Sequence, residues 1–171
     1  MPKTAVLPVV AAVAMVAVVS ASVARADASP SLRPGATHAV PLYGQLVRPY
    51  DAPKDPYAPG HRGVDIAAAA GTPVRASADG VVSFAGNVAG NLTATIDHGG
   101  GLKTTYSYLG SIAAKRGQQV LRGDVLGAVG TGQPESNVPH VHLSARRDDV
   151  YFDPLELYVG ESYADLVSLV G

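Results

Sequence analysis

The chain of 171 residues has no cysteine and no tryptophan, and only 16% of its residues are charged. The absence of cysteine excludes disulfides, thiolate metal sites and cysteine nucleophiles. The net charge is −1, so the chain lacks the excess of basic residues that is typical of nucleic-acid-binding domains. We therefore expect no nucleic-acid partner. Any metal would have to be bound by carboxylates and by the five histidines of the chain.

Glycine and proline, in contrast, are abundant, with 19 and 13 copies, and 47% of the residues are hydrophobic. This composition favours a single β-rich domain with many turns. Short apolar runs bounded by turn residues predict strands at 73–77, 80–85, 92–97, 102–109, 119–121, 126–129 and 140–145. We expect a mainly β fold, an antiparallel sheet or sandwich with little helix, because no longer helical segments alternate with these strands.

The segment 117–127 carries a more specific pattern. Two apolar pairs, at 120–121 and 125–126, flank the turn Gly123-Asp124. This resembles the half-barrel elements of biotinyl or lipoyl carrier domains. A carrier needs an exposed lysine at a hairpin tip, and neither Lys103 nor Lys115 has that setting, so the pattern indicates the fold and not that function. A carrier or adhesion module remains the least favoured alternative.

The N-terminal segment predicts export. Residues 4–24 contain no charge, Lys3 precedes them, and Ala24-Arg25-Ala26 matches a cleavage pattern of small residues. We therefore expect a secretory signal peptide at 1–26 and a secreted or cell-wall protein. The alternative is a retained membrane anchor, which would be the chain's one membrane contact. Residues 27–44 predict a linker, 45–158 the domain, and 159–171 a helical tail.

Two short segments could supply metal ligands. The first holds His61 and Asp65, and Gly63 between them permits the bend that brings both to one ion. The second holds His140 and His142, which point to the same side if the segment is a strand. The alternatives are a surface turn and a pair of exposed strand histidines. We expect His38 to be exposed in a loop and His98 to be a turn histidine bonded to backbone or carboxylate.

The order of these segments resembles that of the LytM-type, lysostaphin-like zinc metallopeptidases of peptidase family M23. The matching pieces are 61–66, 71–74, 78–82, 96–99, 104–106, 117–127 and 140–142. The resemblance implies that His61, Asp65 and His142 bind Zn²⁺, with His140 as a catalytic histidine. It also implies an antiparallel sheet with a groove above it, and peptidoglycan peptides as the substrate.

One position departs from the family pattern. A second catalytic histidine usually stands where this chain has Tyr108, in the sequence Tyr106-Ser107-Tyr108-Leu109. Tyrosine can donate a hydrogen bond to an oxyanion, but its pKa near 10 makes it a poor base. We therefore include Tyr108 among the catalytic candidates as a donor. The alternative is a catalytically degenerate domain that binds peptidoglycan or regulates another cell-wall hydrolase.

Overall fold

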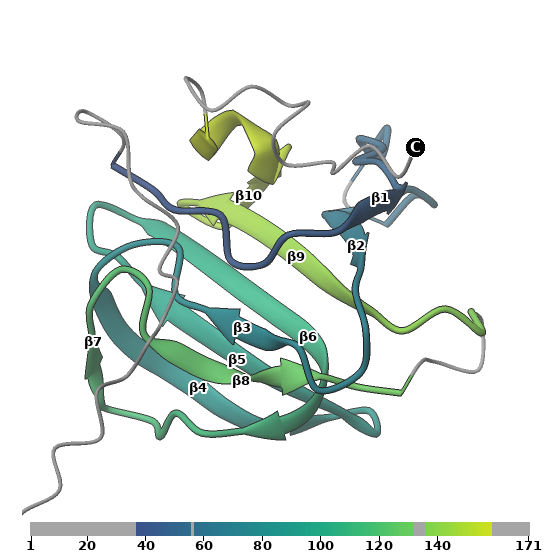
Figure 1. Cartoon of the computed structure of the whole chain (residues 1–171). Helices are drawn as coiled ribbons and strands as arrows, with labels where there is room; N and C mark the ends of the chain where they lie inside the picture. Colours follow the sequence, from purple (N-terminus) through teal and green to yellow (C-terminus); the bar gives the residue numbers. More distant parts are fainter. Residues whose placement is uncertain (1–36, 56, 132–135, 159–171) are drawn as a thin grey trace, which may run out of the picture.

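A computed structural model describes residues 37–55, 57–131 and 136–158. An antiparallel sheet dominates this part of the chain (Figure 1). Its strands are β1 (Gln45–Arg48), β2 (Val64–Ala67), β3 (Pro73–Arg75), β4 (Gly80–Val88), β5 (Asn91–Asp97), β6 (Leu102–Ile112), β7 (Gln119–Val120), β8 (Val125–Val129), β9 (His140–Arg147) and β10 (Val150–Phe152). The predicted mainly β, antiparallel fold with little helix is confirmed.

The path through the sheet is β1-β2-β9-β6-β5-β4-β7, with β10 against β9. The strand β8 pairs with both β3 and β6, and Figure 1 shows β3 and β8 lying across the sheet. All seven predicted strands are present, although several bounds move. Three strands were not predicted: β1, β2 and β10. Each is short, with at most four residues, so little periodicity marks it.

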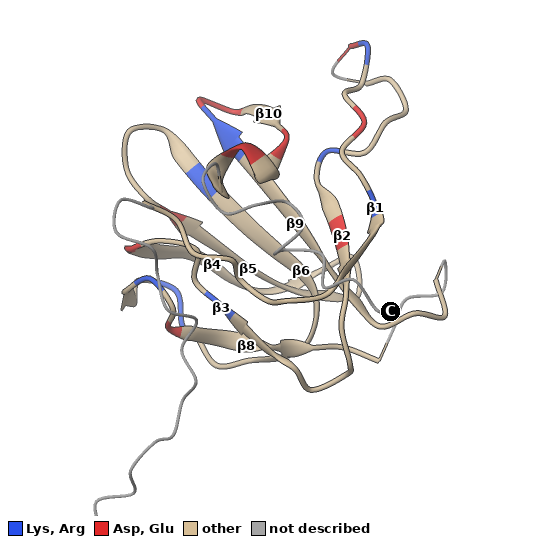
Figure 2. Ribbon diagram, turned by 45° about the horizontal axis from the view of Figure 1, so that its top comes forward, with Lys and Arg blue, Asp and Glu red and all other residues tan. Residues whose placement is uncertain are grey.

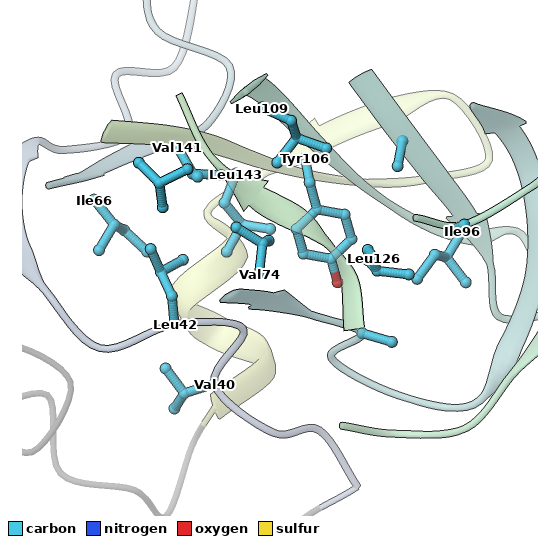
Figure 3. Close-up of a cluster of buried hydrophobic side chains, with 14 of the residues drawn as sticks. Val40, Leu42, Ile66, Val74, Ile96, Tyr106, Leu109, Leu126, Val141 and Leu143 are labelled. Carbon is cyan, nitrogen blue, oxygen red and sulfur yellow. The ribbon is translucent and has the colours of Figure 1, made fainter. Parts of the chain in front are cut away.

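Alternation along the central strands separates the two faces of the sheet. On β9, Val141 and Leu143 are fully buried, whereas His142 between them belongs to the opposite, open face. On β6 the fully buried Tyr106 likewise lies on the core side. These side chains pack with Val74 from β3 and others in one apolar cluster (Figure 3). The core therefore fixes the orientation of every polar side chain on the open face.

The end of the predicted linker belongs to this core. Val40 and Leu42 are buried and join the apolar cluster (Figure 3). The backbone N–H of Ala39 donates to the carbonyl of Ser77, and that of Arg75 donates to the carbonyl of Pro41. Residues 39–42 thus pack as part of the domain, because all four are apolar and buried and their backbone bonds to the segment of β3. The rest of the predicted linker before residue 37 lies outside the described residues.

After Asp153 the chain forms a short 3-10 helix, η1 (Pro154–Tyr158). Its Tyr158 is buried, and the Tyr158 hydroxyl lies 2.8 Å from the hydroxyl of Ser77. Within the described ranges, no helix is long and apolar enough to span a membrane. The predicted signal peptide at 1–26 and the predicted tail at 159–171 both lie outside the described residues.

Candidate metal centre

Neighbouring strands bring the two predicted ligand segments together. Asp65 on β2 is the direct cross-strand partner of His142 on β9. His61 stands four residues before Asp65. Two backbone hydrogen bonds fix it to Asp51: the His61 N–H donates to the Asp51 carbonyl at 2.8 Å, and the Asp51 N–H donates to the His61 carbonyl at 3.0 Å. The chain bends between His61 and β2, so the imidazole turns back over the strand pair. His61 and Asp65 are buried, with 6% and 8% exposure.

Three donor atoms form a compact triangle. His61 Nε2 lies 3.2 Å from Asp65 Oδ1 and 3.1 Å from His142 Nδ1. His142 Nδ1 lies 2.8 Å from Asp65 Oδ1. In the described part of the chain, these three residues form the one His and carboxylate group arranged to hold a metal ion. The sequence-predicted ligands therefore meet at a single point.

The triangle matches the face of a zinc tetrahedron. Bonds of about 2.0–2.1 Å at tetrahedral angles place neighbouring ligand atoms about 3.3 Å apart. The observed separations of 2.8–3.2 Å are close to that edge. Two imidazoles and one carboxylate are also a donor set that zinc prefers. The residues present therefore fit a zinc ion with its fourth position open.

Neighbouring groups set the protonation states of two of the candidate ligands. The Pro49 carbonyl lies 2.7 Å from His61 Nδ1, which donates to it and leaves Nε2 as the metal-facing lone pair. Burial by itself would raise the pKa of Asp65. The hydrogen bond and the charge of His142, together with the charges of His61 and His140, outweigh that effect and lower the Asp65 pKa. The carboxylate is therefore ionised and ready to bind a cation.

Gly63 leaves the space that the His142 ring occupies. A Cβ at this position would stand 2.7 Å from both Cε1 and Nε2 of His142 and would collide with the Leu143 carbonyl oxygen. We expect Gly63→Ala to displace the ring and weaken zinc affinity about 10–100-fold, the size of effect seen when a ligand loses its support. Competition with a chromophoric chelator measures this. Gly86→Ala, whose Cβ would meet only the end of the Phe84 ring, is the matched control. Unchanged affinity in Gly63→Ala would contradict the role of this gap.

The other two predicted site residues border the same cavity. The ring centroid of Tyr108 lies 5.1 Å from that of His140 and 6.0 Å from that of His142. All three metal-ligand candidates and both of these residues line a pocket of about 260 Å³. The pocket also contains Val47, Arg48 and Ser136, which our sequence prediction missed. No periodicity or motif marks these three residues, because loops and an edge strand bring them in.

His140 has a defined tautomer in this arrangement. Its Nδ1 lies 2.8 Å from the Val138 carbonyl oxygen, which can only accept, so Nδ1 carries the proton. In the neutral imidazole, Nε2 is then an acceptor. His140 is buried, with 5% exposure. A histidine fixed in this way can take a proton from a group in the pocket.

The backbone of Tyr108 is strained. Its φ is +66°, in the left-handed region that bulky residues rarely adopt. Pairing of β6 with β9 ends at Ser107, and pairing with β8 begins at Leu109. A bulge relative to β5 lies at the same point. Leu92 and Ala94 are two residues apart on β5, whereas their partners on β6, Leu109 and Tyr106, are three residues apart. Bulges of this kind re-aim a side chain, and this one brings Tyr108 toward the metal ligands.

The two remaining histidines lie elsewhere. His98 Nδ1 is 2.7 Å from the Asp79 carbonyl, so the prediction of a turn histidine bonded to backbone is confirmed. The prediction that His38 is exposed is wrong. His38 is half-buried, its ring lies edge-on to that of His98 at 5.9 Å, and its Nε2 is shielded from solvent. Its burial follows from the packing of residues 39–42 into the core.

Both of these histidines make stability depend on pH. Burial lowers the pKa of His98, opposed in part by its bond to Asp79, and burial lowers the pKa of His38 as well. In the unfolded chain these side chains bind protons near pH 6.5. In the folded chain their lowered pKa values mean that they bind protons only at lower pH. Stability is therefore lost as pH falls below that value. Urea unfolding with a chelator present, at about pH 7.5 and about pH 5.5, should show this loss. His98→Gln should reduce the slope, and an equal slope would contradict the assignment.

Comparison with known proteins agrees with this geometry. The family model described as peptidase family M23 matches residues 59–154. The DD-carboxypeptidase/endopeptidase Mpg of Neisseria meningitidis is 42% identical over 99 residues, which are 57% of this chain and 22% of Mpg. Peptidoglycan DD-endopeptidase ShyA of Vibrio cholerae is 44% identical over 85 residues, 48% of this chain and 19% of ShyA. This chain thus spans about a fifth of each relative.

Among solved structures, a zinc-containing peptidase from Vibrio cholerae superimposes with a TM-score of 0.55 and 29% identity. The match covers 64% of this chain and 35% of that one. The family match at 59–154 includes more than half of the chain and all five residues of the candidate site. The fold, the ligand triangle and the family match thus agree, and this chain belongs to peptidase family M23.

Proposed function

We propose that this protein is a secreted zinc metalloendopeptidase that hydrolyses peptide bonds in bacterial peptidoglycan. The observation that carries the proposal is the triangle of His61, Asp65 and His142, with His140 in the same pocket. Zinc in such a site polarises a carbonyl and lowers the pKa of a water molecule to about 7. The protein residues would then orient the peptide, move a proton and stabilise developing charge.

His140 is the proposed proton acceptor. Its Nδ1 proton is committed to the Val138 carbonyl at 2.8 Å, which leaves Nε2 as the basic atom. His140 would remove the proton from the attacking water and pass it to the leaving amine. Among the described residues that line the pocket, the other histidines are the two metal ligands. The proton transfer therefore depends on His140.

Tyr108 is the proposed donor to the oxyanion. The centroid of its ring lies 5.1 Å from that of His140 and 6.0 Å from that of His142. A phenolic hydroxyl can donate to the negative oxygen that develops on the carbonyl, and one such donor contributes about 10²–10³ in rate. The strain of its backbone, with φ at +66°, supports a positional role for this side chain.

The substrate class and the location rest on separate support. Relatives named as a DD-carboxypeptidase/endopeptidase and a peptidoglycan DD-endopeptidase are 42% and 44% identical to this chain over 99 and 85 residues. The export pattern of residues 1–26 supports an extracellular place of action, where peptidoglycan is found. Both observations favour cell-wall peptides over other substrates.

The test combines metal analysis with an activity assay. The purified chain is expected to bind one zinc and to release new amino termini from purified peptidoglycan. A chelator should stop the release, and added zinc should restore it. Bound zinc without any cleavage between mildly acidic and mildly alkaline pH would contradict the enzymatic proposal.

A catalytically degenerate domain that binds peptidoglycan or regulates another hydrolase is the second candidate. Tyr108, where the family pattern has histidine, favours it. For the enzyme, Tyr108→Phe should lower cleavage about 10²–10³-fold without loss of zinc. For the degenerate domain, wild type should be inert and Tyr108→His should create activity. Cleavage rates of the three proteins, measured at equal zinc content, separate the two candidates.

A further inference from the structure

A second cavity adjoins the metal centre on the open face of the sheet. It has a volume of about 580 Å³ and is lined by residues of β4, β5, β6, β9 and β10. His142 lines this cavity as well as the pocket of the metal ligands, so the two adjoin at this side chain. The cavity therefore forms a groove that leads away from the candidate ligands.

Strand register arranges the floor of this groove in rows. Ser107 faces His142 across the β6–β9 pair, and its hydroxyl accepts from Thr93 at 3.2 Å. The next row, two residues along each strand, contains Thr95, Thr105 and Ser144. Thr95 and Thr105 share a hydrogen bond of 3.0 Å. These hydroxyls provide donors and acceptors that suit the backbone of an extended peptide.

The third row is basic. Lys103 on β6 stands directly opposite Arg146 on β9. Figure 2 shows blue, basic segments of the sheet near β10. Arg62, which follows the ligand His61, is the third cation on the lining, and no carboxylate belongs to the described lining. Like charges in direct cross-strand opposition destabilise a sheet, so this pair is unfavourable for folding alone.

Acidic neighbours only partly compensate these cations. Asp97 lies 3.6 Å from Lys103, and Asp149 lies 3.5 Å from Arg146. Both separations exceed the roughly 2.7–2.9 Å of a strong charge-assisted hydrogen bond, and such exposed pairs are weak. The Asp149 side chain is 84% exposed. Arg146 Nε is buried and has no hydrogen-bond partner in the described part of the chain. The Arg146 side chain is 33% exposed, so the accessible part of its guanidinium can bind an anion in the groove.

We propose that the Lys103–Arg146 pair binds a carboxylate of the substrate peptide, so that this protein selects acidic peptides. The inference rests on the proposed function, because it treats the groove as the path of the substrate. Arg146 is four residues beyond His142 on β9, about 13 Å along an extended strand. The bound carboxylate should accordingly lie about four residues of extended backbone from the cleaved bond.

Binding of two matched peptides tests the proposal. The probes are a peptidoglycan stem peptide with free carboxylates and the same peptide with its carboxylates amidated. Calorimetry on the full chain, with a chelator to prevent turnover, should give an affinity at least about tenfold higher for the free acid. Raising the salt concentration should shrink this preference.

Substitutions then locate the binding site. The double variant with Lys103→Gln and Arg146→Gln should bind both peptides equally, and each single variant should show part of the loss. Arg116→Gln, which removes an exposed charge outside the groove, should keep the full preference. Thermal unfolding of each variant checks that the fold persists.

Two results would overturn the proposal: equal affinity of wild type for the two peptides, or binding of neither. Preserved selectivity in the double variant would overturn the assignment to this pair. If the protein is not a peptidase, the result is different: it would bind the free acid selectively but would not cleave it when zinc is supplied. Cleavage of both peptides with equal affinity would reject the carboxylate site and leave the peptidase proposal intact.

Discussion

Replacing His142 with alanine should abolish both zinc binding and cleavage. His142 Nδ1 is 2.8 Å from Asp65 Oδ1 and 3.1 Å from His61 Nε2, so its loss removes one corner of the ligand triangle. Two remaining protein ligands are too few for a stable catalytic zinc site, which normally has three. Cleavage should fall by at least roughly 10³-fold, because carbonyl polarisation and water activation are both lost.

Metal content by mass spectrometry and release of amino termini from peptidoglycan measure the two effects. His38→Ala is the matched control, because His38 lies outside the ligand group and contacts His98 instead. The control should retain one zinc per chain and full cleavage. Full zinc content in His142→Ala would show that the triangle is not the metal site. Lost zinc with undiminished cleavage would show that the reaction does not need it.

Replacing His140 with alanine should have a different signature, in which zinc remains and turnover falls. His140 lies outside the ligand triangle, and its Nδ1 is held by the Val138 carbonyl. Loss of a positioned general base typically costs about 10²–10⁴ in rate. We expect kcat to fall by that amount while zinc affinity changes little.

Added imidazole provides a second readout for this variant. A small base that can enter the pocket of about 260 Å³ should restore part of the lost rate. Imidazole should not accelerate Gly63→Ala, whose defect lies in ligand placement. An unchanged rate in His140→Ala would show that another group accepts the proton. Loss of zinc in the same variant would show that His140 belongs to the ligand set.

Much of the fold could be predicted from local patterns. The central strands carry long apolar alternation bounded by glycine, and each was predicted close to its place. The strands β1, β2 and β10 could not be predicted, because they are short and form through pairing with β2 or β9. The turn before β10 depends on Asp148 and Asp149 with φ of +49° and +65°, a tight hairpin that aspartate tolerates.

The candidate site divides in the same way. Its residue types were visible in the sequence, since few histidines exist and three lie in two short motifs. The strain at Tyr108 was not visible, because it comes from β6 changing partners from β9 to β8. The basic row of Lys103 and Arg146 was also hidden. These residues are 43 positions apart, and only the register of two long strands sets them opposite each other.

The sequence by itself determined which functional groups are available, namely no thiols and a small set of histidines and carboxylates. It also determined, through its alternating pattern, that the chain forms β-sheet. These are properties of side chains and their local periodicity. The tertiary structure alone decided which polar side chains share a face and at what distance. Strand register and bulges arise from packing across the whole sheet, and they place His61, Asp65 and His142 at one point with a basic groove beside them.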